Sequence, residues 1–203
     1  MLFVPYNQGV FLISDRQSTK ADGTKEVWDK IYLIKKSNAI IGLSGSSEGT
    51  RSIAQELIDT QNEKPFVAQY IDSYRKFFHM VTMDTKEKIV EALIIIKSLD
   101  SIQPYKFIGE IQNLLNLQNP SGIGTGEHII RPQLVQNTNI VTFEMALEFG
   151  KTLIEYASRV SLDVGSPTQF GFCLGVVPFN GEIINQVLEP QQVTIDKMLY
   201  RFT

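Results

Sequence analysis

GVFLISDRQSTKADGTKEVWDKIYLI, residues 9–34, ends one apolar run at Asp15 and begins the next directly after Lys30. Short runs rich in β-branched and aromatic residues, bounded by turn residues, are typical of β-strands. Residues 9–14 and 31–34 are therefore predicted strands. The stretch raises a chemical question, because it brings a carboxylate and an ammonium group to the ends of two neighbouring strands.

Runs of the same character recur along the chain and predict further strands at 39–44, 91–99, 105–111, 169–177 and 183–188. Several are apolar at consecutive positions, which indicates strands covered on both faces. Apolar residues at helical spacing predict helices over 48–60, 66–84, 126–137 and 142–161. Thr142 is the expected N-cap of the last of these helices.

The order of these elements favours antiparallel sheets. A block of strands precedes two helices, and further strands, one or two helices and final strands follow, which is not the alternation of a parallel sheet. Asn180-Gly181 is a strong hairpin signal between the last two strands. We expect one α+β domain over residues 1–203, with two mainly antiparallel sheets and helices outside both.

Composition excludes several classes of function. Of the 203 residues, 19 are basic and 22 acidic, which favours neither a nucleic-acid partner nor an anionic membrane. No apolar run approaches the roughly 20 residues that span a bilayer. The single Cys173 cannot form an internal disulfide, so a cytoplasmic protein is expected. His79, His128 and Cys173 lack zinc-site spacing, and we expect no metal, no cofactor and no role for either histidine at the site.

Four segments together resemble one family. They are GVFLISDRQST with the lysine of KIYLI, AIIGLSGSSEGT leading into a helix, GIGTGE at 122–127, and DVGS at 163–166. In order and spacing they are similar to a proteasome β-type subunit or its bacterial HslV-type relative, within the N-terminal nucleophile (Ntn) hydrolase superfamily. The resemblance implies a four-layer αββα sandwich and a threonine-type peptidase site, in which the amine of an N-terminal threonine acts as the base.

The resemblance also implies roles for particular residues. Asp15 and Lys30 match the charged pair that tunes the nucleophile, and Gly45 matches the glycine whose N–H forms the oxyanion hole. The matches to the supporting polar cluster are Thr125, Asp163 and Ser166. Taken singly, each of these residues also fits a structural role in a turn, a cap or close packing.

The chain departs from the family at the nucleophile. By the family's spacing, the residue that acts as nucleophile would fall about two positions before Met1, and residues 1–6 contain no Thr, Ser or Cys. We therefore expect a subunit without peptidase activity that self-associates into rings, with related subunits or an ATP-driven unfoldase as further partners. Two alternatives stay open: an active threonine-type peptidase whose start lies upstream, and a solitary protein that binds a small ligand between Asp15, Lys30 and Gly45.

Overall fold

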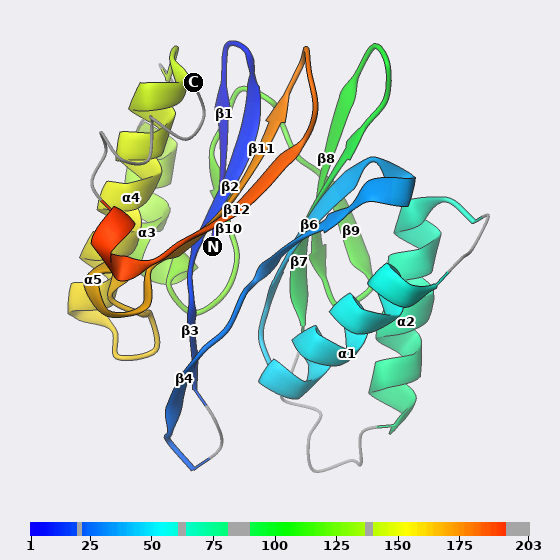
Figure 1. The fold of residues 1–203 in the computed structure, drawn as a ribbon, viewed down its shortest axis with the longest axis horizontal. Coiled ribbons are helices and arrows are strands. Elements are labelled where there is room, and N and C mark those ends of the chain that lie inside the picture. The colour runs from blue at the N-terminus through cyan, green and yellow to red at the C-terminus, as the bar shows by residue number, and fades with distance from the viewer. Residues whose placement is uncertain (20–21, 61–63, 81–89, 137–139, 194–203) are drawn as a thin grey trace.

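Two five-stranded antiparallel sheets pack face to face in the computed structural model, which describes residues 1–203 except 20–21, 61–63, 81–89, 137–139 and 194–203 (Figure 1). The strands of the first sheet, in spatial order, are β10 (Ser121–Gly122), β1 (Leu2–Tyr6), β2 (Gly9–Asp15), β11 (Phe172–Pro178) and β12 (Ile184–Leu188). Those of the second are β5 (Ile31–Ile34), β6 (Ala39–Ser44), β7 (Glu91–Lys97), β8 (Ile102–Ile108) and β9 (Ile111–Leu114). A separate two-stranded ribbon pairs β3 (Gln17–Thr19) with β4 (Lys25–Val27) and extends beyond the ends of both sheets (Figure 1).

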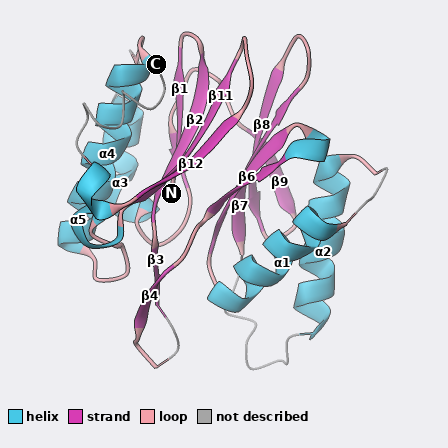
Figure 2. Ribbon diagram, viewed as in Figure 1, coloured by secondary structure: helices cyan, strands magenta, loops and turns pink. Residues whose placement is uncertain are grey.

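Helices cover the outer face of each sheet (Figure 2). The first sheet carries α3 (Glu127–Gln136), α4 (Phe143–Val160) and the short α5 (Pro167–Phe170), and the second carries α1 (Ser47–Asp59) and α2 (Phe66–Met80). Two 3-10 turns, η1 (Lys35–Ser37) and η3 (Pro190–Gln192), complete the described elements. This four-layer αββα sandwich confirms the predicted fold class.

Three apolar layers explain why the strands are apolar at consecutive positions. On β2, Phe11 and Ile13 face α3 and α4, whereas Val10 and Leu12 point into the space between the sheets. Side chains alternate between the two faces of a strand, and here both faces are buried. The β6 and β7 strands repeat this arrangement, with alternate residues packed against α1 and α2.

The long helix α4 begins where its sequence predicts. The Thr142 side chain accepts a hydrogen bond from the Met145 N–H at 3.1 Å, which satisfies one of the unpaired amides of the first turn. The predicted helix 126–137 contains Pro132 as expected, within α3. Residues 81–84 of the predicted helix 66–84 lie outside the described residues.

Two predicted strands differ from the structure because glycines turn the chain. The run 105–111 is divided between β8 and β9 by Gly109, which has φ of +61°. The predicted strand 169–177 begins only at Phe172, because α5 occupies residues 167–170 and Gly171 then turns the chain with φ of +74°. Among the described helices, none is long and apolar enough to span a membrane.

Candidate functional site

A pocket of about 450 Å³ opens where the two sheets meet the β3–β4 ribbon. Its walls include the end of β2, the residues before β5, the β6–α1 turn, and the loop that joins β10 to α3. These segments are far apart in the sequence, so the pocket exists only in the folded chain. The resemblance-based set contributes five lining residues, namely Asp15, Lys30, Gly45, Thr125 and Asp163.

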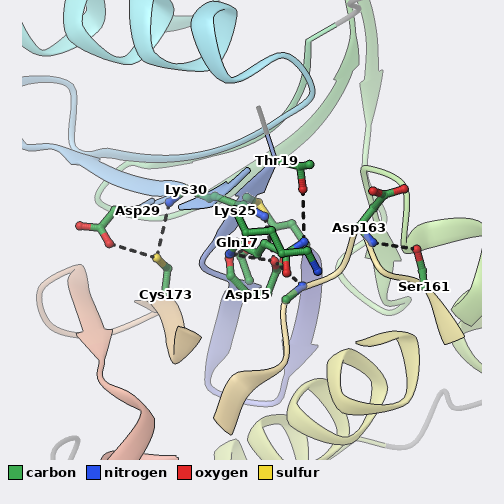
Figure 3. A network of polar contacts seen from close by, with 12 residues as sticks. Asp15, Gln17, Thr19, Lys25, Asp29, Lys30, Ser161, Asp163 and Cys173 are labelled. Atoms are coloured by element: carbon green, nitrogen blue, oxygen red, sulfur yellow. Dashed lines mark hydrogen bonds and ion pairs between the residues drawn. The ribbon is translucent and has the colours of Figure 1, made fainter. Parts of the chain in front are cut away.

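Asp15 and Lys30 form a buried ion pair on the pocket wall (Figure 3). The Lys30 Nζ atom lies 3.1 Å from Oδ1 and 3.0 Å from Oδ2 of Asp15, and Asp15 is only 5% exposed. Its Oδ2 also accepts hydrogen bonds from the N–H groups of Gln17 at 3.1 Å and Gly165 at 3.0 Å. The carboxylate therefore has a cation and two backbone donors around it.

These partners set the protonation state of Asp15. Burial alone would raise the pKa of this carboxyl, but the Lys30 ammonium and the Gly165 N–H favour the charged form. The net result is a pKa below the ordinary 3.8. Asp15 is thus a carboxylate at neutral pH, and it is the direct counter-ion of Lys30.

The backbone around Lys30 is held from both sheets. Its N–H points to the Cys173 sulfur at 3.5 Å, and its carbonyl accepts from the Leu43 N–H at 2.9 Å. Just before it, Asp29 accepts a hydrogen bond from the Arg16 guanidinium at 3.0 Å. The lysine therefore leaves a fixed stretch of backbone, which limits where its ammonium group can lie.

Gly45 lies in the turn that leads from β6 into α1. Its φ of +121° belongs to the left-handed half of conformational space, which favours glycine. Ser46 then caps α1 by accepting from the Gly49 N–H at 3.4 Å. The turn therefore places Gly45 at the pocket wall, just before α1.

The DVGS turn meets the pocket in a way that the sequence did not indicate. Asp163 lines the pocket, and its backbone N–H donates to the Ser161 hydroxyl at 3.2 Å (Figure 3). The group that contacts Asp15 is the N–H of Gly165. The Ser166 hydroxyl instead pairs with the Thr168 hydroxyl at 2.8 Å, and Ser166 is absent from the described pocket lining.

Three lining residues carry polar chemistry that the motifs missed: Trp28, Glu91 and His128. His128, an exposed residue in the first turn of α3, is among the residues that line the pocket, although we expected no role for it at the site. Glu91 begins β7 and accepts a hydrogen bond from the Gly124 N–H at 2.5 Å. No sequence motif marks these positions, since each reaches the pocket through the packing of a different element.

Met1 directly precedes β1 and lines the pocket. Its backbone pairs with Ile123 in both directions, with Met1 N donating at 3.2 Å and Ile123 N–H donating back to the Met1 carbonyl at 3.1 Å. Burial is the main cause that lowers the pKa of the Met1 α-amine, from 8.0 to about 6. Among the described residues, no group of three His, Cys, Asp or Glu side chains is arranged to hold a metal ion.

Three solved structures with the same fold are Anbu (ancestral beta-subunit) proteins. The proteins from Yersinia bercovieri and Pseudomonas aeruginosa match with TM-scores of 0.74 and 0.79 at 12% identity, over 99% of this chain and 92% and 91% of theirs. The protein from Hyphomicrobium sp. strain MC1 matches with a TM-score of 0.73 at 11% identity, over 99% of this chain and 95% of its own. No protein-family model and no curated protein matches the sequence.

These matches establish the proteasome-like Ntn fold and correct the predicted family. The prediction of a proteasome β-type or HslV-type subunit is wrong, because the structural neighbours are Anbu proteins, which form a distinct though related family. The reason is physical: the four motifs place strand ends and tight turns that the whole fold requires, so they do not separate its families. At 11–12% identity the likeness concerns the fold alone.

Proposed function

We propose that this protein is a self-associating subunit with a proteasome-like fold, built into an oligomer of many copies. The single observation that carries the proposal is the fold match over 99% of the chain. The Pseudomonas aeruginosa protein of this fold is described as a helical assembly. Head-to-tail contacts between identical subunits either close into a ring or continue as a helix.

The surface of the chain supports repeated contacts of this kind. Large apolar side chains are exposed on several elements, including Leu114 on β9 at 70% and Val135 on α3 at 75%. On α1 and α2, Ile58 and Phe78 are exposed at 46% and 37%. Apolar side chains on opposite sides of the molecule suit contacts between unlike surfaces of identical subunits.

Light scattering on the purified chain at micromolar concentration tests the assembly, and electron microscopy of the same sample distinguishes a ring from a helix. We expect a particle of many subunits. A monomer or simple dimer would contradict the proposal, and it would favour the solitary small-ligand protein instead.

We further propose that the polypeptide beginning at Met1 does not turn over peptides. The Lys30 Nζ atom donates hydrogen bonds to both carboxylate oxygens of Asp15, and no hydrogen bond among the described residues joins it to a hydroxyl. The Ser14 hydroxyl is fully buried and donates to the Asp15 carbonyl. Among the described residues, no hydrogen bond joins His128 to a hydroxyl, so Thr125 lacks an evident base.

One observation favours the alternative of an active peptidase. A buried carboxylate and ammonium at the wall of a pocket are costly to desolvate and are often found where they tune chemistry. Mass spectrometry of the protein isolated from its own cells, with identification of its first residue, decides between the two. A first residue of Thr, Ser or Cys upstream of Met1 favours the peptidase, and Met1 as the first residue favours the subunit without peptidase activity.

The organisation as one domain over residues 1–203 also remains a proposal. Its support is the apolar layer between the sheets, where Leu12 of β2 and Leu93 of β7 belong to one buried cluster. Neither sheet would keep this face covered without the other.

A further inference from the structure

Glu91 connects two walls of the pocket. It is the first residue of β7 and pairs in register with Ser44, the last residue of β6 and the neighbour of Gly45. Its Oε2 atom accepts a hydrogen bond from the Gly124 N–H at 2.5 Å. One carboxylate therefore lies beside the β6–α1 turn and holds the loop that carries Thr125.

At Gly124, the loop that joins β10 to α3 lies close against the end of β6. The φ of Gly124 is +82°, and a Cβ atom added there would lie 2.3 Å from the Ser44 hydroxyl oxygen. The positive φ favours glycine, and a side chain here would displace the Ser44 hydroxyl. The Gly124 N–H is thereby brought within reach of the Glu91 carboxylate.

The two ends of the same loop are held by other groups. Ile123 is paired with the backbone of Met1. Lys106 contacts both ends, because it donates to the Gly122 carbonyl at the end of β10 at 2.7 Å and to both oxygens of Glu127, the first residue of α3, at 3.1 Å. Glu91 is the side chain that holds the middle of the loop, next to Thr125.

We propose that Glu91 is a positioning residue of the pocket, which fixes the loop of Gly124 and Thr125 against the turn of Gly45. A hydrogen bond to a carboxylate is shorter and stronger than one between neutral groups, which suits it to hold an otherwise glycine-rich loop. The role goes beyond the proposed function, because it concerns the shape of the pocket whether or not the chain assembles or cleaves peptides.

Hydrogen exchange with mass spectrometry on the full chain tests the proposal at the Gly124 amide. Glu91→Ala removes the acceptor, and we expect exchange at Gly124 to become roughly tenfold faster or more. Glu91→Gln keeps a side-chain oxygen at the same place and should restore most of the protection. Glu110→Ala, which removes an exposed acidic side chain paired with Arg75, is the matched control and should leave Gly124 unchanged.

The protection of the β6 amides separates a positioning role from a general loss of stability. We expect these amides, over 39–43, to exchange equally in wild type and Glu91→Ala when the oligomeric mass is the same. The proposal is overturned if Gly124 exchanges at the wild-type rate in Glu91→Ala, if Glu91→Gln is as fast as Glu91→Ala, or if the β6 amides accelerate in parallel. Should Glu91→Ala fail to fold, an unprotected Gly124 amide in the wild-type chain overturns it equally.

Discussion

Lys30 and Asp15 join the two sheets of the sandwich through their side chains. Asp15 ends β2 in the first sheet and Lys30 precedes β5 in the second, yet Nζ of Lys30 lies 3.1 and 3.0 Å from the two carboxylate oxygens. The pair answers the question raised by residues 9–34. A carboxylate and an ammonium stand at neighbouring strand ends because the fold brings those ends to one pocket wall.

Lys30→Met is expected to destabilise the fold. Removing one partner of a buried ion pair leaves an uncompensated charge, which typically costs about 3–5 kcal/mol. We expect the lower end of that range, because Asp15 keeps hydrogen bonds from Gln17 and Gly165. Urea unfolding of the wild type and the variant measures the change. The matched control is Lys64→Met, which removes an exposed pair with Asp72 and should leave the midpoint unchanged; equal effects of the two variants would contradict a special role for the buried pair.

The pH dependence of stability should reveal the charge of Asp15. Its folded-state pKa lies below 3.8, so its contribution is present above that value and is lost as the pH falls through the lower folded pKa. The difference in unfolding free energy between wild type and Asp15→Asn should therefore be constant near neutral pH and shrink in acid. A difference that grows as the pH falls would mean that Asp15 is protonated in the folded chain.

Gly165→Ala should disturb the Asp15–Lys30 ion pair, because the Gly165 N–H donates to Asp15. A Cβ atom at this position would lie 2.5 Å from the Gln17 Cβ and 3.0 Å from Oδ2 of Asp15. Such crowding in a packed site typically costs about 1–3 kcal/mol, and here it would also weaken the Gly165 hydrogen bond. We expect a lower melting temperature and a smaller acid-dependent loss of stability than in wild type. An unchanged melting temperature would show that the DVGS turn can move away without cost.

Cys173 should be unreactive while the chain is folded. It is fully buried, and burial is the main cause that raises the pKa of its thiol to about 12. Because the thiolate is the reactive form, iodoacetamide at pH 8 should label Cys173 orders of magnitude more slowly in buffer than in denaturant. Rapid labelling of the native protein would mean that β11 opens readily beside Lys30.

The sequence predicted the fold well because its signals are local. The runs 31–34 and 39–44 coincide with β5 and β6, and the Thr142 cap fixes the start of α4. Burial of both faces of β2 follows from its unbroken apolar run. The missed elements are short, which leaves too little for a periodic pattern. The strands β10, β3 and β4 have two or three residues, α5 has four, and β1 has five with Pro5 among them.

The site was less predictable, because its polar contacts depend on distant packing. The resemblance gathered Asp15, Lys30, Gly45, Thr125 and Asp163, and the structure places all five at one pocket. It could not indicate that Gly165 rather than Ser166 contacts Asp15, since that depends on how the turn lies against β2. Glu91 and His128 belong to none of the four motifs.

The proposed absence of peptidase activity is tested most directly by incubating the chain beginning at Met1 with a β-lactone or a peptide epoxyketone and then measuring its intact mass. Fluorogenic peptides are assayed on the same sample, with Lys30→Ala as the control. We predict no covalent adduct and no cleavage above that control. A stoichiometric adduct that maps to the first residues, to Ser14 or to Thr125 would contradict the account and assign the protein to the active peptidases.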